Sequence, residues 1–166
     1  MPEDSELYYT DESAIDEFYG REYGYAPRGE KVIGELSGQK FKRTNLVSAY
    51  FKGKSVAPFE FEGTMDGDLF ESWLEQVFVP ELLNPEKSVL ILDNASPHKK
   101  DNIMDIAYEY GFKVIFLPPY SPDLNPIENF WANLKIFLRN FAHNFKTIQD
   151  AIMNFFQATR LYHFAI

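Results

Sequence analysis

The hydrophobic pattern divides the chain into a strand-rich beginning and a helix-rich remainder. Short aromatic and apolar runs, separated by glycine and proline, are typical of strands joined by turns. Such runs predict strands at 7–10, 31–34, 45–51 and 55–61, and Pro58 is typical of an edge strand. Farther along, apolar residues recur at the spacing of one helix face, which predicts helices at 68–79, 100–110, 126–139 and 147–159.

Two further apolar runs, at 89–92 and 113–117, fall between these helices and are typical of buried parallel strands. Several strands therefore come first in the chain, and strands and helices then alternate. This order predicts an α/β fold in which a mixed sheet has helices on both faces. An RNase H-like sheet has this order of elements, and other α/β folds share it. We expect a single domain over residues 1–166, because the length suits one core and no stretch has the composition of a linker.

The composition excludes several classes of protein. Hydrophobic residues make up 45% of the chain and aromatic residues 17%, which argues against disorder. There is no cysteine, so disulfides, zinc–thiolate sites and a cysteine nucleophile are excluded. No apolar run approaches the roughly 18 residues that a membrane span needs, and the acidic N-terminus does not resemble a signal peptide. We therefore expect a cytoplasmic protein with no membrane partner, associated with the nucleoid if the host is bacterial.

Charge is acidic overall and unevenly distributed. The net charge of −9 argues against a protein that binds nucleic acid through global basicity. Residues 1–30 carry nine acids and two bases, and residues 55–86 carry eight acids and no base. Between them, residues 31–54 carry six bases and one acid, a net charge of +5. This basic stretch is either a solvated face or a contact surface for DNA.

Three carboxylates stand at comparable places in this pattern. Asp93 directly follows the apolar run at 89–92, Asp11 ends the first predicted strand, and Glu128 lies in the first turn of the helix after the last strand. Sites in open α/β sheets lie outside the strand ends, where loops and helix starts meet. Carboxylate oxygens there suit Mg²⁺ or Mn²⁺. Two such ions about 4 Å apart hold the attacking and leaving oxygens in phosphoryl transfer.

Each carboxylate also has a purely structural explanation. An aspartate after a strand commonly caps the next turn, which would account for Asp93. Asn125, Pro126 and Glu128 match the N-cap, first and third positions of a helix start, so Glu128 would complete a capping box. Acidic neighbours compete with Asp11 for its role, namely Glu12, Asp16 and Glu17. From residue types alone, the metal site and the structural explanations both stay open.

Two stretches of sequence carry a resemblance to a known family. Residues 89–98 read VLILDNASPH, and residues 115–131 read IFLPPYSPDLNPIENFW. Both closely resemble the DDE transposases of the mariner superfamily and their bacterial insertion-sequence relatives. The second stretch is highly specific because its prolines stand at fixed offsets, and the 34 residues between Asp93 and Glu128 match the family's spacing. YTDES at 9–13 resembles the first acidic motif, and the resemblance extends from about residue 7 to 160.

The resemblance implies an RNase H-like fold and a catalytic triad of Asp11, Asp93 and Glu128 that binds two Mg²⁺ or Mn²⁺ ions. The implied reaction is hydrolytic strand cleavage at the ends of an element, followed by attack of the freed 3′-hydroxyl on target DNA. It needs no covalent enzyme intermediate, because the carboxylates position metals that polarise the phosphate and activate the nucleophile. DNA is then the partner, and we expect the active complex to be a homo-oligomer.

Other residues receive supporting roles in this interpretation. Prolines between 118 and 126 stiffen the loop that aims Glu128, and Asn125 caps its helix. Trp73 and Trp131 are expected in the core. Candidate DNA contacts are the basic residues and one histidine near the motifs, namely Lys40, Lys42, Arg43, His98, Lys99 and Lys100.

The sequence departs from the family in one respect. Full-length relatives carry helix-turn-helix DNA-binding domains before the catalytic core, whereas about ten residues precede Asp11 here. We therefore expect a separate or missing helix-turn-helix segment to supply sequence recognition, in agreement with the acidic balance of the chain. Two other hypotheses stay open. One is another RNase H-like nuclease, and the other is an inactive or domesticated remnant that acts as a DNA-binding or assembly module.

Overall fold

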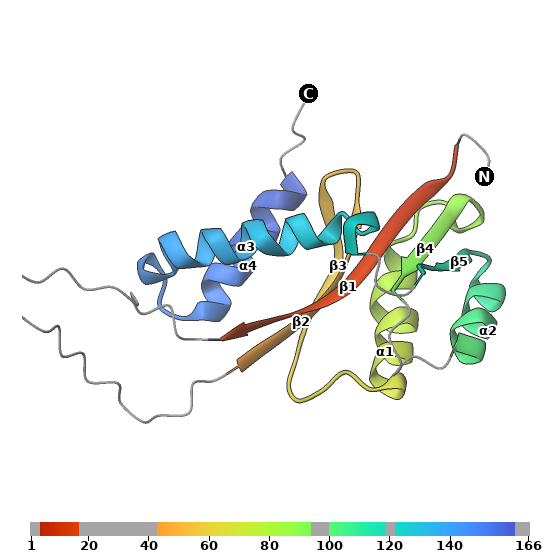
Figure 1. Ribbon diagram of the computed structural model, residues 1–166, viewed down its shortest axis with the longest axis horizontal. Coiled ribbons are helices and arrows are strands. Elements are labelled where there is room, and N and C mark those ends of the chain that lie inside the picture. Colours follow the sequence, from red (N-terminus) through yellow and green to blue (C-terminus); the bar gives the residue numbers. More distant parts are fainter. Residues whose placement is uncertain (1–3, 17–42, 94–99, 119–121, 162–166) are drawn as a thin grey trace, which may run out of the picture.

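A computed structural model describes residues 4–16, 43–93, 100–118 and 122–161 of the chain. Its centre is a five-stranded sheet with the strand order β3-β2-β1-β4-β5 (Figure 1). The strands are β1 (Glu6–Asp16), β2 (Arg43–Phe51), β3 (Lys54–Phe61), β4 (Ser88–Leu92) and β5 (Lys113–Phe116). β1, β2 and β3 are antiparallel neighbours, whereas β4 pairs parallel with β1 and β5 parallel with β4. The predicted mixed sheet is confirmed, and the predicted strand at 31–34 lies outside the described residues.

β1 is the central strand of the sheet. It pairs with β4 only from Glu6 to Tyr9, and with β2 from Tyr9 to Asp16. The expectation that the first strand ends at Asp11 is wrong, because β2 continues to supply backbone hydrogen-bond partners as far as Asp16. Asp11 therefore lies inside a strand, at a point where only one of the two neighbouring strands is still paired with it.

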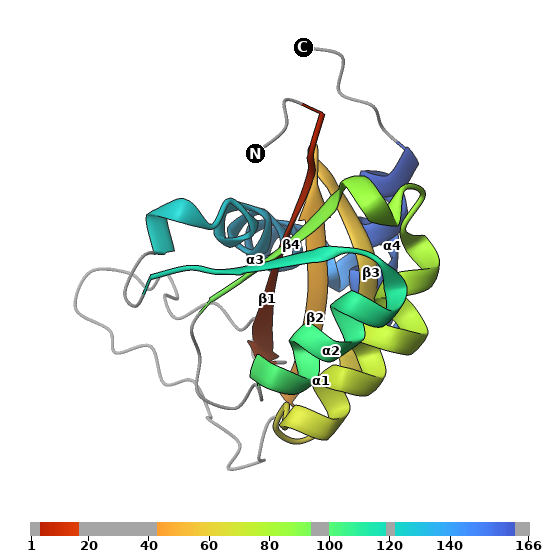
Figure 2. The same cartoon turned by 90° about the vertical axis from the view of Figure 1, so that its right-hand side faces the viewer.

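One face of the sheet is covered by α1 (Gly67–Trp73) and α2 (Lys100–Tyr110), which lie side by side in Figure 2. α1 continues through a π-helical turn, Leu74–Phe78. These helices enclose an apolar core with Tyr8 of β1 and Leu90 of β4. Trp73 is 1% exposed and its indole N–H donates to the carbonyl of Ala57 at 2.9 Å, which confirms its predicted place in the core.

The opposite face is covered by α3 (Ile127–Phe141) and α4 (Ile148–Leu161) (Figure 1). They enclose a second core that includes Ile15 of β1 and Leu46 of β2. Trp131 is 2% exposed within this core, as predicted. The prediction of helices on both faces is therefore confirmed.

The helices begin and end close to where the pattern predicts. α2 spans the predicted range and is followed by Gly111, whose φ of +79° is a conformation that favours glycine. α1 begins after Asp66, whose side chain caps the helix by accepting a hydrogen bond from the backbone N–H of Leu69 at 2.8 Å. In the described ranges, short 3₁₀ turns connect the elements at Val79–Glu81, Pro85–Lys87, Pro122–Leu124 and Ala142–Asn144. Within the described ranges, no helix combines the length and apolar character that crossing a membrane requires.

Candidate active site

The register of the sheet carries Asp11 to the end of β4. Tyr9 of β1 pairs with Ile91 of β4, and this is the last pair between the two strands. Asp11 and Asp93 each stand two residues farther along. Because β1 and β4 are parallel, the same offset on both strands brings the two carboxylates to the same edge of the sheet.

Glu128 reaches this edge from α3. Side chains alternate along β1, so Asp11 faces the same side of the sheet as Ile15, which belongs to the core beneath α3. Ile127 is fully buried in that core and fixes the first turn of α3 against the sheet. Glu128, the next residue, is exposed, and its backbone N–H donates to the carbonyl of Asn125 at 3.2 Å.

The side chain of Asn125 does not cap α3, contrary to the prediction. The N-cap residue is Pro126, and no side-chain hydrogen bond caps the helix, so Glu128 does not complete a capping box. Asn125 is 6% exposed, its Nδ2 donates to the carbonyl of Thr10 at 3.5 Å, and its Oδ1 has no hydrogen-bond partner among the described residues. The side chain turns toward β1 because the packed strand offers it a partner. It thereby links the turn before Glu128 to the residue before Asp11.

The carboxyl group of Asp11 is buried and lies within electrostatic reach of two other carboxylates. Burial raises the pKa of Asp11 from its ordinary 3.8 to about 7, and the carboxylates of Glu128 and Asp93 also raise it. A backbone hydrogen bond from Glu12 acts in the opposite direction. These charge effects agree with the register of β1 and β4, which brings Asp11 and Asp93 to the same edge of the sheet.

The chemistry of these residues fits a divalent cation. Carboxylate oxygens are hard ligands, and a cation between them offsets the repulsion that raises the pKa of Asp11. In the described part of the chain, however, no group of three or more acidic or histidine side chains is arranged closely enough to hold a metal ion. Asp11, Asp93 and Glu128 thus share one edge of the sheet without closing around a common point.

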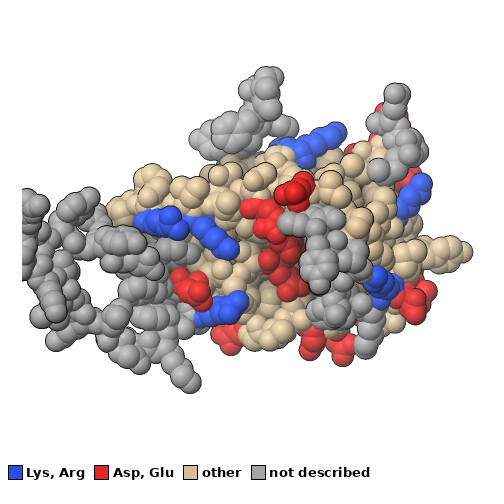
Figure 3. Space-filling model, in the orientation of Figure 1, with Lys and Arg blue, Asp and Glu red and all other residues tan. Residues whose placement is uncertain are grey.

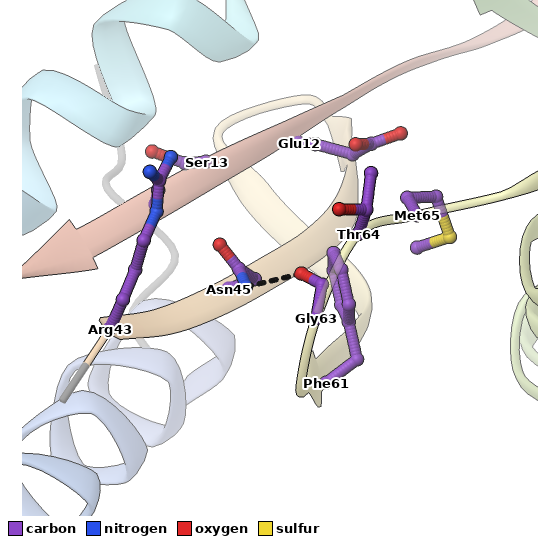
Figure 4. A pocket seen from close by; sticks show the side chains of 9 residues that line it. Glu12, Ser13, Arg43, Asn45, Phe61, Gly63, Thr64 and Met65 are labelled. Atoms are coloured by element: carbon purple, nitrogen blue, oxygen red, sulfur yellow. Dashed lines mark hydrogen bonds between the residues drawn. The ribbon is translucent and has the colours of Figure 1, made fainter. Parts of the chain in front are cut away.

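Glu12 is a further acidic residue of this region, and sequence reasoning treated it only as a competitor of Asp11. Strand alternation sends the two side chains to opposite faces, and Glu12 lines a hollow of about 600 Å³ with Phe61 and Met65 (Figure 4). Burial, and then the charge of Asp93, raise the pKa of Glu12 to about 7. Asp93 therefore influences acidic groups on both faces of the sheet edge.

The predicted DNA contacts are only partly described. Lys40, Lys42, His98 and Lys99 lie outside the described residues. Arg43 is exposed at the start of β2 and lines the same hollow as Glu12. Lys100 is exposed at the start of α2, with its Nζ 5.0 Å from the centre of the Phe116 ring. These two basic residues belong to different elements, β2 and α2.

A family model described as the DDE superfamily endonuclease matches residues 6–152. The chain belongs to the DDE superfamily of endonucleases. The match includes the positions of all three predicted catalytic carboxylates, and it confirms the family that the motifs around Asp93 and Glu128 indicate.

The chain is also similar to individual known proteins. The human histone-lysine N-methyltransferase SETMAR is 33% identical over 79 residues, which are 46% of this DDE chain and 12% of SETMAR. The Mos1 transposase paired-end complex with left transposon end has a TM-score of 0.66 at 17% identity, covering 94% of this chain and 48% of that one. The Mos1 mariner paired end complex with Mn has a TM-score of 0.62 at 17% identity, with coverages of 94% and 48%.

The chain spans about half the length of these Mos1 chains and a small part of SETMAR. At such sequence identities, the structural likeness shows a shared fold. The predicted RNase H-like fold of this DDE chain is thereby confirmed.

Proposed function

We propose that this DDE superfamily chain is the catalytic domain of a transposase, which cuts DNA at the ends of a mobile element and joins the freed strand to target DNA. The observation that carries the proposal is the placement of Asp11, Asp93 and Glu128 along one edge of the sheet, beside the carboxyl end of β4. Support comes from family membership and from the shared fold with Mos1 transposase, one structure of which is a strand transfer complex.

Asp11, Asp93 and Glu128 would hold two divalent cations, either Mg²⁺ or Mn²⁺. Such ions prefer carboxylate oxygens, and one of the similar Mos1 structures is a complex with Mn. When bound, the ions polarise the scissile phosphate and activate the attacking water or hydroxyl.

The residues of the chain position these carboxylates on rigid elements. Asp11 belongs to a strand that is paired with β2, and Asp93 directly follows the buried β4. Glu128 is placed by the buried Ile127 and by the contact of Asn125 with Thr10. Sites built on strands and helix starts hold their geometry better than sites on loops, which suits in-line phosphoryl transfer.

Recognition of the element ends would come from another segment. With a net charge of −9, the chain has little general attraction for DNA phosphates. A helix-turn-helix segment, on the same polypeptide or a separate one, would supply sequence choice. A second copy of the catalytic domain would complete an active complex that acts on two element ends.

The proposal is tested by nicking of supercoiled plasmid DNA with Mn²⁺. Asp93→Asn removes a ligand charge while keeping the side-chain shape, and we expect the nicking rate to fall by about 100-fold or more. The matched control is Asp105→Asn. Asp105 is exposed on α2, so this substitution makes the same chemical change outside the site. An Asp93→Asn protein that nicks DNA as fast as its parent would refute the catalytic assignment.

A further inference from the structure

The outward face of α3 aligns basic side chains with Glu128. An α-helix turns by about 100° per residue, so positions 128, 132, 135 and 139 fall within about 60° of one another around its axis. They are Glu128, Ala132, Lys135 and Arg139, and all four are exposed. Because the helix rises by about 1.5 Å per residue, Lys135 lies roughly 10 Å and Arg139 roughly 16 Å along the axis from Glu128.

We call Glu128, Ala132, Lys135 and Arg139 the α3 stripe. The charge around this stripe is unlike that of the chain as a whole. Residues 127–146 contain three bases and one acid, which is Glu128 itself, in a chain with a net charge of −9. Neither Lys135 nor Arg139 forms a hydrogen bond or ion pair with another described residue. Figure 3 shows Lys and Arg side chains along α3, in line with a group of acidic side chains near the centre of the same face.

Exposed bases in a row are the usual ligands of a phosphate backbone. Lysine neutralises a phosphate as a point charge, and the arginine guanidinium binds it through two parallel hydrogen bonds. The acidic site by itself repels phosphate, so bases farther along the same line are needed to hold a strand across it. A backbone that passes Glu128 and follows α3 meets Lys135 and then Arg139.

We propose that Lys135 and Arg139 form a phosphate-binding track for the DNA strand that extends from the active site along α3. The proposal rests on the proposed function, because it takes DNA as the substrate. It extends that function by assigning binding residues outside the motifs of the family resemblance and outside the basic stretch at 31–54.

The test measures DNA binding rather than chemistry. The full chain and its variants are titrated against a fluorescent duplex of about 30 base pairs in EDTA, so that no cleavage takes place, and the titration is repeated over a range of salt concentrations. Lys135→Gln with Arg139→Gln is expected to weaken binding by about 10-fold at low salt. The slope of log K against log salt should fall by about 2, one for each lost phosphate contact.

The matched control is Lys87→Gln with Lys113→Gln. Both lysines are exposed, and they precede β4 and begin β5, at the amino ends of the strands rather than at the site. This double variant makes the same change in net charge and is expected to leave the salt slope unaltered. Lys135→Arg with Arg139→Lys keeps the charge and should restore binding close to that of the parent.

A second pair of variants separates position from charge on the same helix. Ala132→Glu places an acid within the stripe, whereas Asn133→Glu places one on the neighbouring exposed side of α3. We expect Ala132→Glu to weaken DNA binding several-fold more than Asn133→Glu. Glutamate is a good helix former, so neither change should disturb the helix.

Three outcomes would overturn the track. The first is that the Lys135/Arg139 and Lys87/Lys113 glutamine variants weaken DNA binding equally. The second is that neither double variant weakens DNA binding. The third is that the parent chain binds no DNA even at low salt. The outcome is independent of catalysis. If the track variants behave as expected while Asp93→Asn nicks DNA like its parent, the proposed function fails and the binding surface stands. If nicking depends on Asp93 and the track variants bind DNA like the parent, the proposed function stands and the binding surface fails.

Discussion

The carboxyl group of Asp11 lies half-buried beside other carboxylates, and this placement opposes folding at neutral pH. Its raised pKa means that the folded state binds a proton more tightly than the unfolded chain does. The contribution of this group to stability is therefore greatest below about pH 4 and falls as the pH rises toward about 7. The same crowding of negative charge is what makes the edge of the sheet a suitable site for cations.

Asp11→Asn removes this charge and should stabilise the metal-free protein. One pKa unit corresponds to about 1.4 kcal/mol, and partial contact with solvent reduces the full effect, so we expect a gain on the order of 2 kcal/mol at pH 8. The gain should shrink as the pH is lowered from 8 to 5.5. Urea unfolding in EDTA measures it, with the exposed Asp105→Asn as control. If the Asp11→Asn protein were less stable than its parent at pH 8, the charge of Asp11 would not oppose folding as we expect.

We expect Asn125 to act through Glu128 rather than on a substrate. Its link to Thr10 is long, at 3.5 Å, and its Oδ1 has no described partner, so Asn125→Ala should change stability by less than about 1 kcal/mol. The turn before Glu128 then loses its tie to β1, and we expect Mn²⁺ affinity to fall by about 10-fold, a change measured by calorimetry. Asn129→Ala, an exposed asparagine on the same helix, should leave the affinity unchanged. Equal affinities for all three proteins would rule out this positioning role.

At the scale of elements, β1 and α3 determine the site. β1 extends seven residues beyond its last pair with β4, from Thr10 to Asp16. Over these residues, the side of β1 that faces away from β2 has no paired strand among the described residues. α3 starts above that edge, with Ile127 buried and Glu128 exposed. The site thus forms where one strand ends, the next continues and a helix begins.

The cap of α1 gives a prediction that concerns stability alone. Asp66→Ala removes the side-chain acceptor for the Leu69 N–H, and loss of such a cap should lower the free energy of unfolding by about 1 kcal/mol. Urea unfolding measures the change. Glu62→Ala, which removes an exposed acid from the preceding loop, is the control for net charge. Because α1 covers the face opposite α3, plasmid nicking by Asp66→Ala should equal that of the parent once the protein is folded.

At the scale of the whole molecule, the described residues form two apolar cores, one on each side of the sheet, and the acidic edge lies between them. One core holds α1 and α2 against the sheet, and the other holds α3 and α4. Asp11 and Glu128 join elements of the second core to the sheet edge, and Asp93 follows a strand that packs in the first. A cation bound by all three would therefore connect both halves of the fold.

Binding of Mn²⁺ should therefore stabilise the entire domain. A ligand at 100 times its dissociation constant stabilises the folded state by about 2.7 kcal/mol, which gives a rise in melting temperature that calorimetry detects. Glu128→Gln should abolish most of this rise, whereas Glu109→Gln, an exposed residue of α2, should preserve it. A rise of the same size in both variants would mean that Mn²⁺ binds elsewhere.

Sequence patterns located the helices, the buried strands and the acidic residues, because those features depend on local periodicity and residue chemistry. The predicted helix at 100–110 agrees with the structure for this reason. The end of β1 did not follow from local pattern, since it depends on pairing with a strand about thirty residues away in the sequence. The prediction that the Asn125 side chain caps α3 was wrong for a similar reason. An isolated helix start would have used it as a cap, whereas the packed strand offers it the carbonyl of Thr10.

By itself, the sequence determined the family of this protein, its order of elements and the identity of three acidic residues with the chemistry of metal ligands. The tertiary structure alone decided that Asp11 and Asp93 share an edge of the sheet, and that α3 is seated with Glu128 beside that edge. The reason is physical. Residue type and periodicity act over a few positions, while strand register and the seating of a helix on a sheet bring together groups that are far apart in the chain.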